Sequence, residues 1–74
     1  MKYEDAVKWA RKEEHKLGLH DFNQTVEIIH QDGSVFILNY AHMKIKERFV
    51  CVWTEHHGQF VFFREDLASY LVLS

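Results

Sequence analysis

The chain has 74 residues, of which 47% are hydrophobic and 15% aromatic, and its formal net charge is −2. This composition excludes a disordered chain, and so mild a negative charge argues against both a DNA mimic and a nonspecific nucleic-acid binder. The length fits a single domain over residues 1–74, close to the lower limit for a self-sufficient core.

The cysteine content and the absence of long apolar runs indicate in which cellular compartment the protein is found. A single cysteine leaves no internal disulfide, which favours a reducing environment. The opening residues, Met-Lys-Tyr-Glu-Asp, lack the apolar stretch of a signal peptide, and no apolar run approaches the roughly 18 residues that span a bilayer. We therefore expect a cytoplasmic protein that does not enter a membrane.

Residues 3–17 are predicted to form an amphipathic helix. Lys16 would lie in its last turn, with Gly18 as the residue that ends it in a left-handed conformation. Trp9 lies at the margin of the apolar face, where it could cover a core or contact a partner. The apolar face recurs with helical spacing and comprises Tyr3, Ala6, Val7, Ala10 and Leu17.

Two strands, 24–30 and 35–42, are predicted around an Asp-Gly turn. A two-residue turn at Asp32 and Gly33 would pair Ile28 with Ile37. The segment 43–47 could then be a loose loop or an extension of the strands on both sides of it. This register would group the apolar side chains of one face as Val26, Ile28, Val35 and Ile37.

A second hairpin, strands 48–54 and 59–64, is predicted around Glu55-His-His-Gly58, and a short helix over 65–73. The helix is suggested by Leu67, Tyr70 and Leu71 at helical spacing, with Glu65 and Asp66 in its first turn. The predicted fold class is α+β, an antiparallel four-stranded meander with an N-terminal and a short C-terminal helix (α-β-β-β-β-α).

The second hairpin is apolar on both faces, whichever register it adopts. Phe49, Cys51 and Trp53 alternate with Val50 and Val52. In the next strand Phe60 and Phe62 alternate with Val61 and Phe63, and either Trp53 or Val52 would lie opposite Phe60. Two helices could cover about one face. The two helices could instead take opposite faces and leave each face half covered, or a second copy of the chain or a partner protein could cover the remaining face.

From this apolar excess we predict a non-enzymatic protein-interaction module that self-associates as a homodimer or docks on another protein. The candidate interaction surface consists of Trp9, Trp53, Phe60 and Phe62. We expect no cofactor and no metal.

A histidine site is the first alternative. His42, Glu55, His56 and His57 could converge at the second turn and support a small histidine- or metal-dependent enzyme. No pair of the six histidines has the spacing of a zinc signature, so solvated turn residues are the favoured interpretation. Cys51 is interpreted as a small buried hydrophobic residue.

Nucleic-acid binding is the second alternative. Its only basic group is Lys44, Lys46 and Arg48, which Ile45 and Glu47 interrupt. We favour a solvated hairpin tip for these residues, which makes nucleic acid an unlikely partner.

The segment from Val52 to Phe62, Val-Trp-Thr-Glu-His-His-Gly-Gln-Phe-Val-Phe, resembles short stretches in small uncharacterised proteins of bacteriophages and bacteria. Such proteins are often single-domain accessory factors that bind a host protein. The resemblance implies a binding role and assigns no functional residue.

Overall fold

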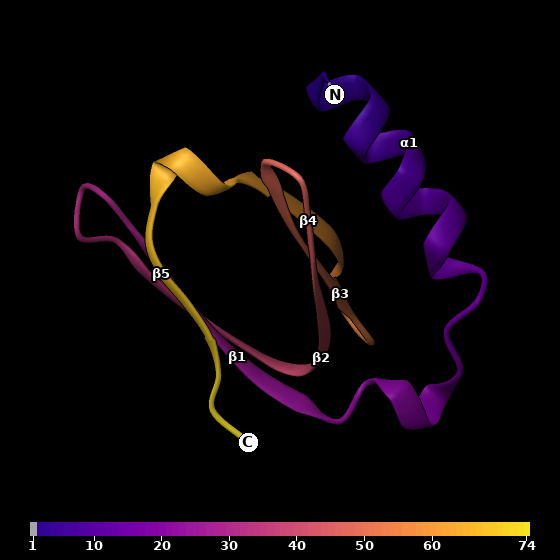
Figure 1. Cartoon of the computed structure of the whole chain (residues 1–74). Coiled ribbons are helices and arrows are strands. Elements are labelled where there is room, and N and C mark those ends of the chain that lie inside the picture. The colour runs from indigo at the N-terminus through magenta and orange to yellow at the C-terminus, as the bar shows by residue number, and fades with distance from the viewer. Residues whose placement is uncertain (1) are drawn as a thin grey trace.

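The computed structural model describes residues 2–74 as one α-helix beside a curled sheet (Figure 1). The elements in chain order are α1 (Tyr3–Glu14), the 3₁₀ turn η1 (Leu19–Asp21), β1 (Gln24–His30), β2 (Val35–Lys46), β3 (Phe49–Thr54), β4 (Gly58–Phe63), the 3₁₀ turn η2 (Arg64–Asp66) and β5 (Leu67–Val72). The α+β class and the antiparallel sheet are confirmed. The sheet has five strands, so the prediction of four is wrong.

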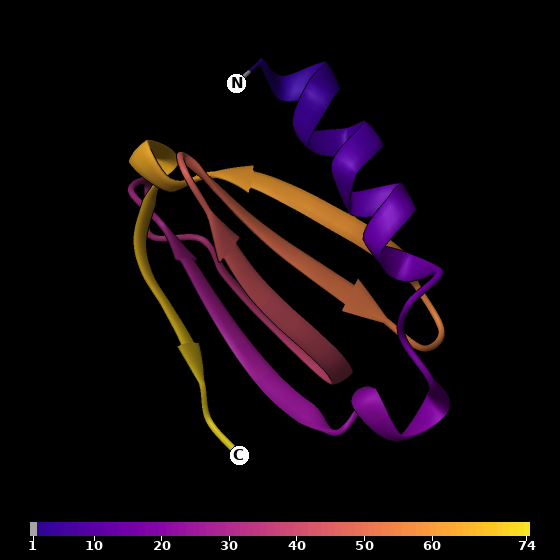
Figure 2. The ribbon, with the colours of Figure 1, turned by 45° about the vertical axis from the view of Figure 1, so that its right-hand side comes forward.

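The strand order is β4-β3-β2-β1-β5, and every neighbouring pair is antiparallel. The twelve-residue β2 holds the sheet together, since its first half pairs with β1 and its second half with β3. The two halves meet at Ala41, beside a bulge in which Tyr40 adopts a φ of 51°. Residues 43–46 therefore extend β2, and Glu47 begins the β2–β3 turn. Figures 1 and 2 show β3 and β4 turned away from β1 and β5, which gives the sheet a concave inner face.

The helix predicted over residues 65–73 is wrong. Only Arg64–Asp66 form a helical turn, and the following residues form β5, which pairs with β1. Ser69 pairs with Ile29 but Leu67 pairs with His30, so this ladder contains a bulge. The bulge lets Leu67 and Tyr70 both pack on the inner face although they are three residues apart. The three-residue spacing of Leu67 and Tyr70, which suggested a helix, is therefore explained by a bulge in a strand.

The β1–β2 hairpin is one residue out of the predicted register. Ile28 pairs with Phe36 instead of Ile37. The cause is a three-residue loop, in which the Gly33 N–H donates to the His30 carbonyl at 3.0 Å and Gly33 takes a φ of 91°. A shift of one residue reverses the faces of a strand, so Ile37 lies on the outer face, opposite to Ile28.

The helix also ends earlier than predicted. α1 ends at Glu14, and Gly18 is extended, with a φ of −103°, so it is not a left-handed end residue. The Gly18 N–H donates to Oδ2 of Asp21 at 2.8 Å, which turns the chain into η1. Leu17 nevertheless packs against the buried residues beneath α1, as its place on the apolar face predicts.

The core consists of two clusters on opposite faces of the sheet, which confirms the alternation predicted for β3. The outer cluster lies under α1 and contains Ala6, Ala10, Phe49, Cys51 and Trp53. The inner cluster fills the concave face and contains Val26, Ile28, Ala41, Val50, Val52 and Leu67. Val52 lies opposite Phe60, as a three-residue loop after Thr54 requires.

The sheet covers the centre of its inner face by curling, which is none of the three arrangements expected from the sequence. Phe36 and Val72, at the margins of that face, stay about half exposed. Val50 and Val52 have no exposed surface. The accessible surface of 4905 Å² is close to the roughly 4,800 Å² that scaling gives for a monomer of this mass. The two-faced hairpin therefore does not by itself require a second chain.

Candidate interaction surface

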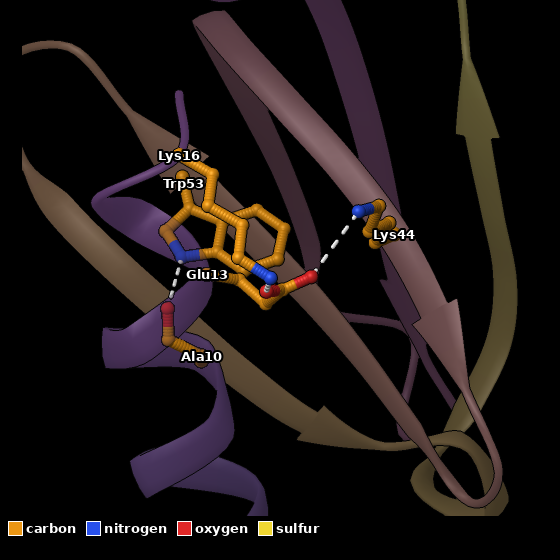
Figure 3. A network of polar contacts seen from close by, with 5 residues as sticks. All are labelled: Ala10, Glu13, Lys16, Lys44 and Trp53. Atoms are coloured by element: carbon orange, nitrogen blue, oxygen red, sulfur yellow. Dashed lines mark hydrogen bonds and ion pairs between the residues drawn. The ribbon is translucent and has the colours of Figure 1, made fainter. Parts of the chain in front are cut away.

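Trp53 belongs to the core, where it joins β3 to α1. Its side chain is 1% exposed, and its indole Nε1–H donates to the Ala10 carbonyl at 2.8 Å (Figure 3). Trp9 is half-buried beside it, with ring centroids 6.0 Å apart, and the Lys46 Nζ lies 4.4 Å from the Trp9 ring. Trp53 as folded has no surface to offer a partner.

Phe60 and Phe62 lie on the inner face of β4, on the opposite side of the sheet from Trp9 and Trp53. Their rings stack at 6.2 Å, and both residues are half-buried. Phe62 also meets the His30 ring edge-on at 5.5 Å, so it closes the concave face against β1. The four aromatic residues chosen from the sequence therefore form two pairs on two faces, not one surface.

Two of the three basic residues, Lys44 and Lys46, contact α1. Lys44 donates to Oε1 of Glu13 at 3.4 Å, and Lys16 contacts the other oxygen at 2.7 Å (Figure 3). The hydrogen bond from Lys16 holds the pKa of Glu13 below its ordinary value. Lys44 and Lys46 lie along β2 on the helix side of the sheet, while Arg48 lies in the β2–β3 turn. Lys44 and Lys46 therefore belong to a strand packed beside a helix, and only Arg48 lies at the exposed hairpin tip that the sequence suggested.

The histidine turn does not gather a metal-binding set. His56 Nε2 lies 3.7 Å from Glu55 Oε2, at the exposed tip of the β3–β4 loop. His42 lies on the helix side of β2, where its ring is 6.1 Å from that of Trp53. Across residues 2–74, no three His, Cys, Asp or Glu side chains are placed to hold a metal ion.

Thr54 shapes the same loop. Its Oγ1 accepts from the His57 N–H and donates to the Gly58 carbonyl, both at 2.8 Å. These bonds make the loop a closed turn in which the hydroxyl of a buried threonine satisfies the backbone. The contacts account for the conformation of the turn.

Cys51 is buried under α1, which confirms its interpretation as a small core residue. Burial raises the pKa of its thiol to about 11, and Lys46 opposes that rise only weakly. A thiol held in the neutral form is a poor nucleophile.

An outer ribbon of apolar side chains crosses the three strands that α1 leaves uncovered. Its members sit on the convex face of β1, β2 and β5, since Ile29 pairs with both Val35 and Ser69, and Glu27 pairs with both Ile37 and Leu71. The exposed fractions are 55% for Val35, 48% for Ile37 and 52% for Leu71. We define the outer ribbon as Ile29, Val35, Ile37 and Leu71.

A lone carboxylate lies in this ribbon. Glu27 is flanked by Ile37 and Leu71, its partners on the neighbouring strands. Within the part of the chain that the structure describes, its side chain makes no hydrogen bond and no ion pair. The ribbon thus offers a partner an apolar surface with one negative charge inside it.

The outer ribbon is absent from the fold predicted from the sequence for two reasons. The predicted register placed Val35 and Ile37 with the buried Ile28, and the predicted helix removed Leu71 from the sheet. The available signal was the glycine of the first turn: Gly33 in a three-residue loop gives the observed register directly.

A shallow hollow of about 630 Å³ lies where the chain passes from β4 to β5. Two arginines line it, and Arg64 is already engaged, because it donates from Nη1 to the Glu47 carbonyl at 2.8 Å and from Nε to the Tyr70 hydroxyl at 3.1 Å. These bonds tie the end of β4 to β5.

Comparison of the chain with family models, with curated proteins and with solved structures finds no match. Of the helices in residues 2–74, none has the length and apolar character that crossing a membrane requires.

Proposed function

We propose that this protein is a non-enzymatic protein-interaction module and that its docking surface is the outer ribbon. The observation that carries the proposal is the group of half-exposed apolar side chains on the outer face of β1, β2 and β5, behind the fully buried centre of the inner face. Val26 and Ile28 have no exposed surface, whereas Val35, Ile37 and Leu71 on the other face are about half exposed. A contiguous apolar patch on a small folded domain is typical of a site for a protein partner.

The charge inside the ribbon specifies the chemistry of that partner. A carboxylate covered by an apolar surface loses its hydration, which is costly unless a cation pairs with it. We therefore expect the partner to present apolar side chains around one lysine or arginine, placed to meet Glu27. Two ribbons packed face to face would bring two Glu27 carboxylates into one dry interface, so this face suits a different protein better than a second copy.

A binding role agrees with the accessory proteins of bacteriophages and bacteria that the segment from Val52 to Phe62 resembles. The same role would place the protein in the cytoplasm beside a host factor.

Site-specific photo-crosslinking in the producing cells tests the proposal. A photoreactive amino acid at Ile37 should give one discrete adduct with another protein, and the same group at Lys12, on the exposed side of α1, should give none. Val35→Asp should abolish the Ile37 adduct because it places a second negative charge beside the first. Equal labelling from both positions, or an Ile37 adduct that survives Val35→Asp, would contradict the proposal.

A further inference from the structure

The two margins of the sheet differ in how they are protected. β4 is flanked by α1, which packs against β4 and β3 (Figure 2). β5 has only β1 beside it in the sheet, and Figure 2 shows no other element along its free side. Folded proteins normally block such an edge with charged residues, proline or a covering element. Residues 67–73, Leu-Ala-Ser-Tyr-Leu-Val-Leu, carry no charge and no proline.

The pairing with β1 determines which backbone groups of β5 are unpaired. Ser69 and Leu71 face Ile29 and Glu27, and the Leu73 N–H donates to the Thr25 carbonyl at 2.7 Å. Because these groups alternate along a strand, the N–H and C=O of Tyr70 and Val72 point away from the sheet. They are placed to accept one more strand.

We propose that this strand is β5 of a second copy, paired antiparallel about a two-fold axis at Leu71. In that register Tyr70 of each copy lies opposite Val72 of the other, and the two residues exchange both of their backbone hydrogen bonds. Leu71 lies opposite Leu71 of the other copy on the outer face. The two Tyr70–Val72 pairs lie on the inner face, and a pair of an aromatic and a β-branched residue is favourable on neighbouring strands.

Charge favours a second copy over an unrelated strand. In an interface with two-fold symmetry, a residue near the axis lies close to the same residue of the other copy. Any charge near the axis would therefore meet a like charge. The residues of β5 carry no charge, and the nearest ribbon carboxylate, Glu27, is on β1, one strand removed. The Arg64 guanidinium lies beside Tyr70, where its Nε donates to the Tyr70 hydroxyl of the same chain at 3.1 Å. The pairing would also cover Leu71, Val72 and Leu73, which are all about half exposed.

The proposed pairing goes beyond the docking function and is independent of it. It joins two five-stranded sheets into one and sets the two outer ribbons side by side on the same surface. A partner could then meet both ribbons at once, although neither ribbon needs the other in order to dock.

Sedimentation velocity on the whole protein, from about 1 µM to about 500 µM, tests the pairing. The natural sequence should shift from monomer to dimer across this range. Leu71→Lys should raise the dimer dissociation constant about tenfold or more, because it sets two ammonium groups across the axis. Ile37→Lys is the matched control: Ile37 is as exposed as Leu71 and on the same face, but away from the edge, so its dimer should persist.

A mixture of variants locates the axis. Leu71→Glu alone should also be monomeric, whereas Leu71→Lys mixed with Leu71→Glu should form heterodimers, because opposite charges then meet. Circular dichroism melts check that each variant is folded. The proposal is overturned if the natural protein stays monomeric throughout, if Ile37→Lys disrupts the dimer as much as Leu71→Lys, or if the mixture stays monomeric. None of these outcomes would remove the crosslink from Ile37, so failure of the pairing is distinguishable from failure of docking.

Discussion

Replacing Trp53 by phenylalanine should destabilise the protein by about 2 kcal/mol. The indole Nε1–H that donates to the Ala10 carbonyl is lost, and a buried hydrogen bond contributes about 1 kcal/mol. The Ala10 carbonyl also accepts the helical bond of α1, so it is not left without a partner. The smaller ring leaves about 40 Å³ unfilled, which adds about 1 kcal/mol at about 24 cal/mol per Å³.

Urea unfolding followed by far-UV circular dichroism measures this loss without relying on tryptophan fluorescence. For a domain of this size, about 2 kcal/mol lowers the melting temperature by about 10 °C. The slope of the unfolding free energy against urea should not change, because the exposed surface on unfolding is nearly the same.

Trp9→Phe is the matched control. Trp9 is half-buried, and among the described residues its indole N–H donates to no protein group. The phenyl ring can still lie beneath Lys46, so the loss should be below about 1 kcal/mol. If Trp53→Phe costs no more than Trp9→Phe, the bond to α1 and the packing beneath the helix do not stabilise the fold as argued.

Three further predictions test the register, a turn and a buried thiol. Ile28→Ala should lower the unfolding free energy by about 2 to 5 kcal/mol, because Ile28 is fully buried. Ile37→Ala should lower it by about 0.5 kcal/mol or less, because Ile37 is half exposed. Equal losses in urea titrations would support the register expected from the sequence instead. Gly58→Ala should cost about 1 to 2 kcal/mol from its φ of 74° alone, because nothing lies within 4 Å of the added methyl; a thermal melt unchanged by this substitution would refute the assignment. The Cys51 thiol should resist a disulfide reagent near pH 8 and react on unfolding. Because burial raises its folded pKa to about 11, its contribution to stability is full below the ordinary thiol pKa and is lost as the pH rises through about 11. Melts between pH 8 and 11 should therefore fall more steeply for the natural protein than for Cys51→Ala.

The spacing of apolar residues along the sequence, together with the glycines of the turns, was enough to predict the helix and four of the strands. Alternation along β3 separated Cys51 from Val52 correctly, and the glycine at position 58 located the second turn. These predictions depend only on local geometry, in which a side chain's face follows from its neighbours.

The remaining features depend on contacts between distant segments. Whether Leu67 and Tyr70 mark a helix or a bulged strand is decided by β1, whose free edge accepts β5. The curvature at Ala41 depends on one strand having two partners, and it removes the apparent shortage of cover for Val50. For the candidate site, the outer ribbon could not be predicted because its residues are set by the loop length at Gly33 and by the pairing of β5.

The pairing of β1 with β5 also bears on how the protein folds. The strands from β1 to β4 follow one another as hairpins, so their contacts form between segments close in the sequence. Val26, by contrast, acquires its second neighbour only when Val72 reaches it. The closure of long loops slows folding, so the addition of β5 is expected to be a late step. Until that step, β1 presents an unpaired edge beside an unfinished inner cluster, and the partly folded chain is most open to aggregation in that interval.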